Sequence, residues 1–181
     1  MPIRNMWSLN PGEVLTAERV SKEIPDCQVY FPLHDKGIDL SLVRGKKHCS
    51  IQVKESRLFE SRKWSSSWHQ VSGTNVDPKP ESRKIIPDFF VFLTYFPQYG
   101  ETKLSKFDER YIIIPTTDLR EKLHSKKASK GKYSFYFVFS DDGEVWDTRE
   151  HTKRYEPGDG VPYTAYLENW HLVEEALSSD R

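Results

Sequence analysis

The chain has 181 residues, of which 36% are hydrophobic and 13% aromatic, with 27 basic and 27 acidic side chains. This length suits one domain, and this apolar and aromatic content excludes an intrinsically disordered chain. The net charge of zero excludes the strongly basic composition by which many nucleic-acid-binding proteins are recognised.

The first predicted element is a helix that begins after Asn10. Asn is a favoured N-cap, Pro11 suits the first helical position, and Glu13 stands where the acid of a capping box is expected. Apolar residues then recur at helical spacing until Pro25, which ends the helix. A strand over residues 27–31 follows.

Two strands joined by a basic turn come next. Residues 38–43 alternate apolar and polar side chains, which predicts a strand with Asp39 on its polar side. Residues 48–54 return after the turn, with Gln52 and Lys54 on one face. We therefore expect an acid, an amide and an amine to lie together on the polar face of this hairpin.

Residues 57–84 carry no strong helix or strand pattern. The segment is rich in Ser, Pro, Arg and Lys, and holds six basic residues against three acids. We expect a loop-rich insertion with basic and aromatic side chains, with a short helix over 59–69 as an alternative for part of it.

The rest of the chain alternates strands and helices. Strands are predicted over 85–95, 111–114 and 133–139, and helices over 117–124 and 167–177. With the first helix and hairpin, this order predicts one domain over residues 1–181 of the α/β (α+β) class, with a mixed central β-sheet flanked by helices.

Charge and cysteine content add two expectations. Residues 120–133 hold six basic residues against one acid, whereas residues 141–181 hold eleven acids against four basic residues, so a basic side and an acidic end are expected unless these are solvated loops. Cys27 and Cys49 form no disulfide framework, and no apolar run reaches the roughly 18 residues of a membrane helix. We expect a cytoplasmic protein without a signal peptide.

The polar face of the hairpin suits metal-assisted hydrolysis of a phosphodiester bond. Asp39 supplies a carboxylate for Mg²⁺ or Mn²⁺, and the carbonyl of Gln52 supplies a second oxygen. Lys54 can orient a water molecule or stabilise charge on the phosphate. Glu13, or alternatively Glu18, can add a carboxylate from the first helix.

The pattern of Asp39, twelve intervening residues and Gln52-Val53-Lys54 resembles the core of the PD-(D/E)XK nuclease superfamily. The resemblance covers residues 10–175 in element order, and residues 37–56 in motif, with Gln52 in place of the second acid. It implies a restriction-endonuclease-like fold, with Glu13, Asp39, Gln52 and Lys54 as catalytic residues and the first three as metal ligands. It also implies DNA as the partner and a homodimer that cuts both strands.

Basic and aromatic residues near the motif are candidates for nucleic-acid contacts. Aromatic rings stack on bases, and Lys or Arg side chains neutralise phosphates. The candidates are Lys46, Lys47, Ser56, Arg62, Lys63, Trp64 and Trp68.

Two other functions stay open. A nuclease fold without catalysis would bind nucleic acid or a protein, and the uncharged Gln52 favours this alternative. A small-molecule-binding α/β domain is the third alternative, although no glycine-rich phosphate loop follows a strand.

Overall fold

Helices and strands occupy most of the residues that the computed structural model describes, namely 9–34, 36–60, 65–78, 84–99, 104–149 and 160–178. The elements in chain order are α1 (Pro11–Glu23), β1 (Gln28–Tyr30), β2 (Leu40–Arg44), β3 (Lys47–Glu60), β4 (Ser65–Ser72), α2 (Gly73–Val76), β5 (Phe89–Tyr99), β6 (Leu104–Pro115), α3 (Thr116–Leu123), β7 (Lys132–Phe139), β8 (Val145–Asp147), β9 (Val161–Pro162), the 3₁₀ turn η3 (Thr164–Tyr166) and α4 (His171–Ser178).

Helix α1 begins where the sequence predicts, with Asn10 as N-cap and Pro11 as its first residue. The backbone N–H of Glu13 donates to the carbonyl of Asn10 at 3.0 Å, and the Asn10 side-chain amide donates to Glu13 Oε1 at 3.0 Å. The pair thus joins side chain to side chain, in place of the side-chain-to-backbone bonds of a capping box. This contact holds the Glu13 carboxylate at the start of the helix.

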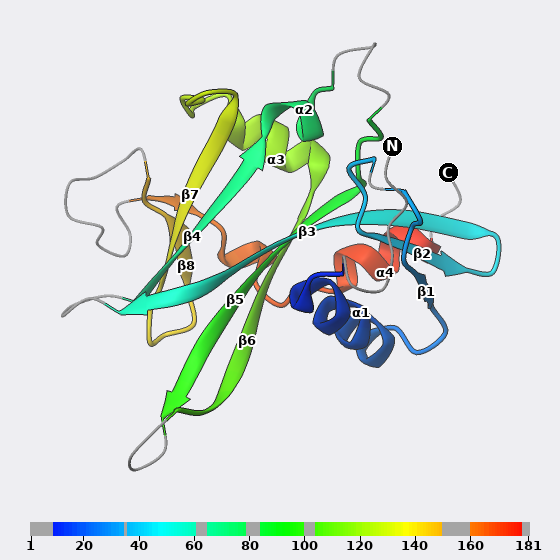
Figure 1. Ribbon diagram of the computed structural model, residues 1–181, viewed down its shortest axis with the longest axis horizontal. Helices are drawn as coiled ribbons and strands as arrows, with labels where there is room; N and C mark the ends of the chain where they lie inside the picture. The colour runs from blue at the N-terminus through cyan, green and yellow to red at the C-terminus, as the bar shows by residue number, and fades with distance from the viewer. Residues whose placement is uncertain are drawn as a thin grey trace.

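The strands form a mixed sheet around β3. Strands β1, β2 and β3 pair antiparallel in sequence, β3 pairs parallel with β5, and β5 pairs antiparallel with β6. The far end of β3 pairs with β4, which leads through β7 and β8 to β9 (Figure 1). The predicted mixed central sheet flanked by helices is confirmed.

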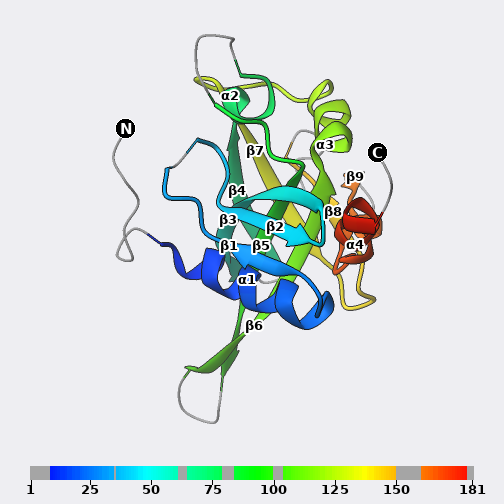
Figure 2. The ribbon, with the colours of Figure 1, turned by 90° about the vertical axis from the view of Figure 1, so that its right-hand side faces the viewer.

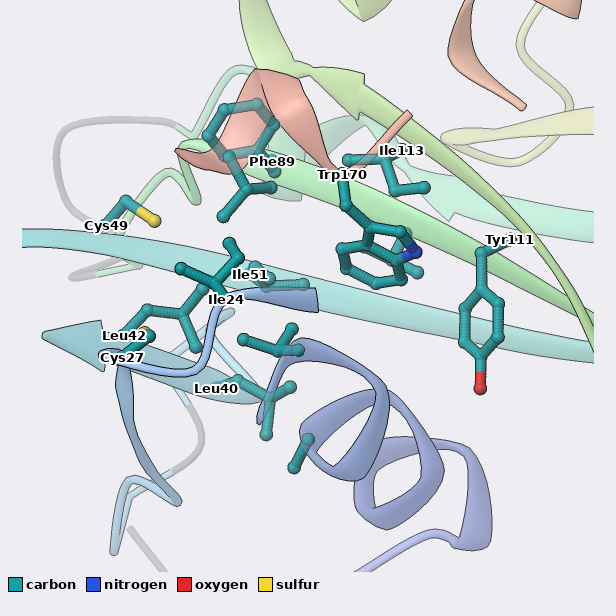
Figure 3. Packing of buried hydrophobic residues seen from close by; sticks show 14 of the residues in the cluster. Ile24, Cys27, Leu40, Leu42, Cys49, Ile51, Phe89, Tyr111, Ile113 and Trp170 are labelled. Carbon is teal, nitrogen blue, oxygen red and sulfur yellow. The ribbon is translucent and has the colours of Figure 1, made fainter. Parts of the chain in front are cut away.

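The buried apolar side chains form two clusters on opposite faces of β5. Val91 belongs to one cluster and its neighbours Phe90 and Phe92 belong to the other, as the two-residue period of a strand requires. The first cluster packs the sheet against α1 and α4 and includes Ile51 and Trp170 (Figure 3). The second cluster contains side chains of β7 and α3. Helices α2 and α3 lie above α1 and α4 in the view of Figure 2.

The prediction of a loop-rich insertion over residues 57–84 is wrong for much of its described part. Strand β3 continues to Glu60, β4 follows, and α2 is a short helix. Strand β4 buries Ser67, His69 and Val71 at alternate positions. Two of these three side chains are polar and bond to each other, so the alternation does not appear as an apolar pattern in the sequence.

Other boundaries differ less. Strand β6 begins seven residues before the predicted start at residue 111. The helix predicted over 167–177 begins only at His171, as α4, and the 3₁₀ turn η3 ends before the predicted range, at Tyr166. Cys27 and Cys49 are buried as free thiols. None of the helices in the described ranges has the length and apolar character needed to cross a bilayer.

Candidate functional site

The hairpin of β2 and β3 places the acid and amide of the motif opposite each other. Leu40 pairs with Ile51, so Asp39, just before β2, lies across from Gln52. Leu40 and Ile51 face the apolar cluster under α1, which puts Asp39 and Gln52 on the other face. The side chains of Asp39 and Gln52 are buried, at 5% and 4% exposure, although they do not face the apolar cluster that contains Leu40 and Ile51.

The Asp39 carboxylate is held by β3. Its Oδ2 accepts a hydrogen bond from the backbone N–H of Val53 at 2.8 Å and another from Nε2 of Gln52. The N–H of Asp39 donates to the carbonyl of Ile51 at 2.8 Å. Burying a carboxylate costs free energy unless donors surround it, and these two donors supply part of that compensation.

This carboxylate lies where the edge of β3 opens. Strand β2 pairs with β3 residues 47–51 and β4 pairs with residues 58–60. Within the described part of the chain, residues 52–57 between them pair with β5 alone. The Asp39 carboxylate therefore bonds to β3 just beyond the end of its pairing with β2, where no strand pairs with this edge of β3. Backbone groups along such an unpaired edge can bond to side chains or to a ligand.

Gln52 connects Asp39 to two residues that sequence reasoning missed. Its Oε1 accepts a hydrogen bond from Nδ2 of Asn75 at 3.1 Å, and Oδ1 of Asn75 accepts one from Nζ of Lys84 at 2.7 Å. Asn75 lies in α2 and is 9% exposed. The sequence carried no signal for this contact, because both residues fall in the segment expected to be a loop.

Glu13 is the buried carboxylate of α1. It is 2% exposed, whereas Glu18 is exposed on the helix surface, so burial favours Glu13 among the two predicted candidates. The start of α1 contacts β3 directly, because the N–H of Gly12 donates to Oε2 of Glu55 at 2.9 Å. The side chains of Val53 and Glu55 face α1, whereas that of Gln52, which bonds to Asp39, faces the other side of the sheet.

A side chain at residue 12 would crowd Glu55. A Cβ on Gly12 would lie 2.6 Å from Glu55 Oε2 and 3.0 Å from Glu55 Cβ, so the exposed Glu55 side chain would have to turn and its hydrogen bond to the Gly12 N–H would be disturbed. Glu55 Oε2 also accepts a hydrogen bond from the Tyr95 hydroxyl at 2.5 Å. Burial and the contact with Glu55 together raise the pKa of Tyr95 above its usual range, so it stays a neutral donor.

Lys54 and Ser56 lie on the same face of β3 as Gln52, because side chains alternate along a strand. Lys54 is half-buried and lies about 7 Å along the strand from Gln52. Lys54 thus keeps the place that the motif predicts for it, on the polar face beside Asp39 and Gln52. Ser56 lies one step further along this face and is also half-buried.

The other predicted nucleic-acid contacts are not gathered at this face. Lys46 and Lys47 lie at the tip of the β2–β3 hairpin, and Lys47 is about 17 Å along β3 from Gln52. Trp68 is 44% exposed and lies on the opposite face of β4 from the buried Ser67. Three further candidates, Arg62, Lys63 and Trp64, lie outside the described residues.

Trp68 has aromatic and basic neighbours of its own. It pairs with Tyr136 across β4 and β7, and the Arg149 guanidinium lies 5.0 Å from the centre of the Tyr136 ring. This outer face of β4 and β7 is a separate surface from the one that carries Asp39.

The donor set suits a hard divalent cation only in part. Asp39 and Glu13 are carboxylates, which Mg²⁺ and Mn²⁺ prefer as ligands. Gln52 turns its amide nitrogen toward Asp39 and its oxygen toward Asn75, so ligation by Gln52 would require the amide to turn by half a rotation. Across the described ranges, His, Cys, Asp and Glu side chains form no group of three or more arranged for a metal ion.

Comparison with known proteins gives limited information. No protein-family model matches the chain, and no curated protein matches its sequence. Among solved structures, a bacterial homing endonuclease is similar to 91% of this chain and 90% of its own, at 17% identity and a TM-score of 0.46. A likeness at this level does not establish a shared family or function.

Proposed function

We propose that the protein is a metal-dependent endonuclease that hydrolyses DNA phosphodiester bonds, in restriction, defence or repair. The observation that carries this proposal is the buried pair of Asp39 and Gln52 beside Lys54, at the open edge of β3. Burying a carboxylate is costly in a merely structural role, and such groups gather at functional sites.

Each residue of the set has a role in that reaction. Asp39 would hold Mg²⁺ or Mn²⁺ at the edge of β3, and Glu13 would have to reach the ion from α1, which packs on the other face of the sheet. The ion when bound shields the phosphate charge and lowers the pKa of a water molecule. Lys54, whose side chain is half-buried, would place its ammonium against the phosphate oxygens. Gln52, predicted as the third ligand, donates its amide N–H to Asp39 and keeps that carboxylate in place.

DNA would reach the site along the polar face of β3. Ser56 lies on that face, and Lys46 and Lys47 would contact a phosphate further along the duplex. Trp68, and Arg62, Lys63 and Trp64 near it in sequence, would contact DNA beyond the site. A homodimer would place one such site on each strand of the DNA. The protein would act in the cytoplasm.

A second function is favoured by one observation, which is the direction of the Gln52 amide. With its nitrogen toward Asp39, the site has two carboxylates for a cation in place of three oxygen ligands. A protein with this site and without catalysis would bind nucleic acid or a protein partner, and would bind DNA equally with or without a divalent cation.

A plasmid cleavage assay tests the proposal. Supercoiled plasmid is incubated with the native chain, Lys54→Ala or Lys106→Ala, in Mg²⁺, Mn²⁺ or a chelator. Lys106 is the matched control, because its side chain is 69% exposed on β6. We expect metal-dependent cutting that falls at least about 100-fold in Lys54→Ala and is retained in Lys106→Ala.

Two results would contradict the proposal. If Lys54→Ala cuts as fast as the native chain, Lys54 has no part in the chemistry. If the native chain binds plasmid and cuts it with neither cation, the binding function is supported in its place. Circular dichroism of Lys54→Ala confirms that a loss of cutting is not a loss of fold.

A further inference from the structure

A chain of hydrogen bonds runs from Lys84 through two amides to Asp39. The Lys84 ammonium donates to Asn75 Oδ1 at 2.7 Å, Asn75 Nδ2 donates to Gln52 Oε1 at 3.1 Å, and Gln52 Nε2 donates to Asp39 Oδ2. Four segments meet in this chain, namely the residues before β5, α2, β3 and the turn before β2. The side chains of Asn75, Gln52 and Asp39 are buried, at 9% exposure or less.

The two ends of the chain determine the direction of every bond in it. A lysine ammonium has three donors and no acceptor, and an ionised carboxylate has acceptors and no donor. Asn75 must therefore turn its oxygen to Lys84, which leaves its nitrogen for Gln52, and Gln52 must turn its nitrogen to Asp39. Reversing one amide alone would set two donors or two oxygens against each other.

From this we infer that Asn75 and Lys84 are positioning residues of the site, which act through Gln52 to hold it as a hydrogen-bond donor to Asp39. The inference rests on the proposed function, and it replaces the predicted role of Gln52 as a metal ligand. The Lys84 ammonium bonds also to Thr74 Oγ1 at 3.0 Å, so it is held at the α2 end of this series of hydrogen bonds.

Removal of the ammonium should release both amides. In Lys84→Met, no ammonium fixes the orientation of the Asn75 and Gln52 amides. The Gln52 amide can then turn, so that Asp39 no longer always receives its N–H. Residues that orient the ligands of a site typically change activity or metal affinity by about 10–100-fold when they are replaced. We expect a fall of this size in the cleavage rate constant with little change in KM, because the DNA-contacting residues are untouched.

Another side chain that only donates hydrogen bonds should restore the series of hydrogen bonds from residue 84 to Asp39. Lys84→Arg keeps a cation and several N–H groups and should recover most of the lost rate. Lys106→Met, at an exposed position on β6, is the matched control and should cut like the native chain. A lysine that only stabilised the fold would change the melting temperature and would leave the ratio of the rate constant to KM unaltered after correction for folded protein.

The side-chain amide resonances of Gln52 and Asn75 provide a test without cleavage. In a ¹⁵N-labelled chain, Lys84→Met should shift the Gln52 NH₂ signals, although Gln52 is separated from Lys84 by a whole side chain. Lys84→Arg and Lys106→Met should leave these signals near their native positions. Asn75→Asp, whose new carboxylate would face the Gln52 oxygen, should also shift them, and it serves if Lys84→Met does not fold.

The outcomes separate this inference from the proposed function. Unchanged Gln52 signals in both Lys84→Met and Asn75→Asp would overturn the inference, whatever the cleavage result. A native chain that cuts no DNA would overturn the proposed function, and the amide signals would still decide whether Lys84 and Asn75 position Gln52. Shifted signals with unchanged cleavage would overturn the positioning role.

Discussion

His69→Gln should remove a large part of the acid sensitivity of the fold. His69 is 2% exposed on β4, and its Nε2 lies 3.2 Å from both Ser67 Oγ and Thr94 Oγ1. The rings of Phe92 and Phe137 lie 5.4 and 5.6 Å from its centre. Burial among these groups lowers the pKa of His69 to about 3, because the charged imidazole cannot be solvated there.

The sign of the effect follows from the two pKa values. In the unfolded chain His69 titrates near pH 6.5, so above that pH both states are neutral and His69 adds no pH dependence. Below pH 6.5 the unfolded chain binds a proton that the folded chain does not bind until about pH 3. The free energy of unfolding therefore falls by about 3 kcal/mol between pH 7 and pH 4 from this group alone.

Urea unfolding at pH 7 and pH 4 measures this quantity. The difference in unfolding free energy between the two pH values should be about 3 kcal/mol smaller in His69→Gln than in the native chain. His124→Gln, at an exposed position after α3, is the control and should keep the native difference. The same pH difference in all three proteins would refute the assignment of this acid sensitivity to His69.

Three further changes test the packing around the site and around Asp147. Lys126→Met leaves the Asp147 carboxylate buried without its ammonium partner at 2.6 Å and should lower the unfolding free energy by about 3–5 kcal/mol, and no change in urea unfolding would contradict this. Gly160→Ala sets a Cβ 2.4 Å from the Asp147 carbonyl oxygen and should lower the melting temperature, so an unchanged value would be inconsistent with this packing. Gly12→Ala crowds the Glu55 side chain and should weaken its hydrogen bond to the start of α1 and reduce cleavage at a retained fold, which native-like cutting would rule out.

Much of the site could be predicted from local rules. The two-residue period of a strand and the length of the turn place Asp39, Gln52 and Lys54 on one face of the hairpin, as the structure has them. Helix capping rules place the start of α1 at Pro11, with Glu13 in its first turn. Each of these inferences uses only residues that are close to one another in the sequence, within one hairpin or one helix start.

The connection to Asn75 and Lys84 could not be predicted in this way. Gln52 lies 23 residues before Asn75 and 32 before Lys84, and no local pattern joins them. The segment between them shows no apolar strand pattern, because the buried positions of β4 include Ser67 and His69, whose hydrogen bonds with each other and with Thr94 replace apolar contacts. The direction of the Gln52 amide depends on a lysine that lies two side chains away.

The most direct test of the central claim is a cleavage assay of Asp39→Asn. This substitution keeps the size of the side chain and an oxygen that can accept the Val53 N–H, and it removes the charge. If Asp39 is a catalytic carboxylate, Asp39→Asn folds with a loss of about 1–2 kcal/mol in unfolding free energy and has no metal-dependent cutting. If Asp39→Asn cuts plasmid at the native rate in Mg²⁺ or Mn²⁺, then Asp39 is a structural residue and the site is not at this edge of β3.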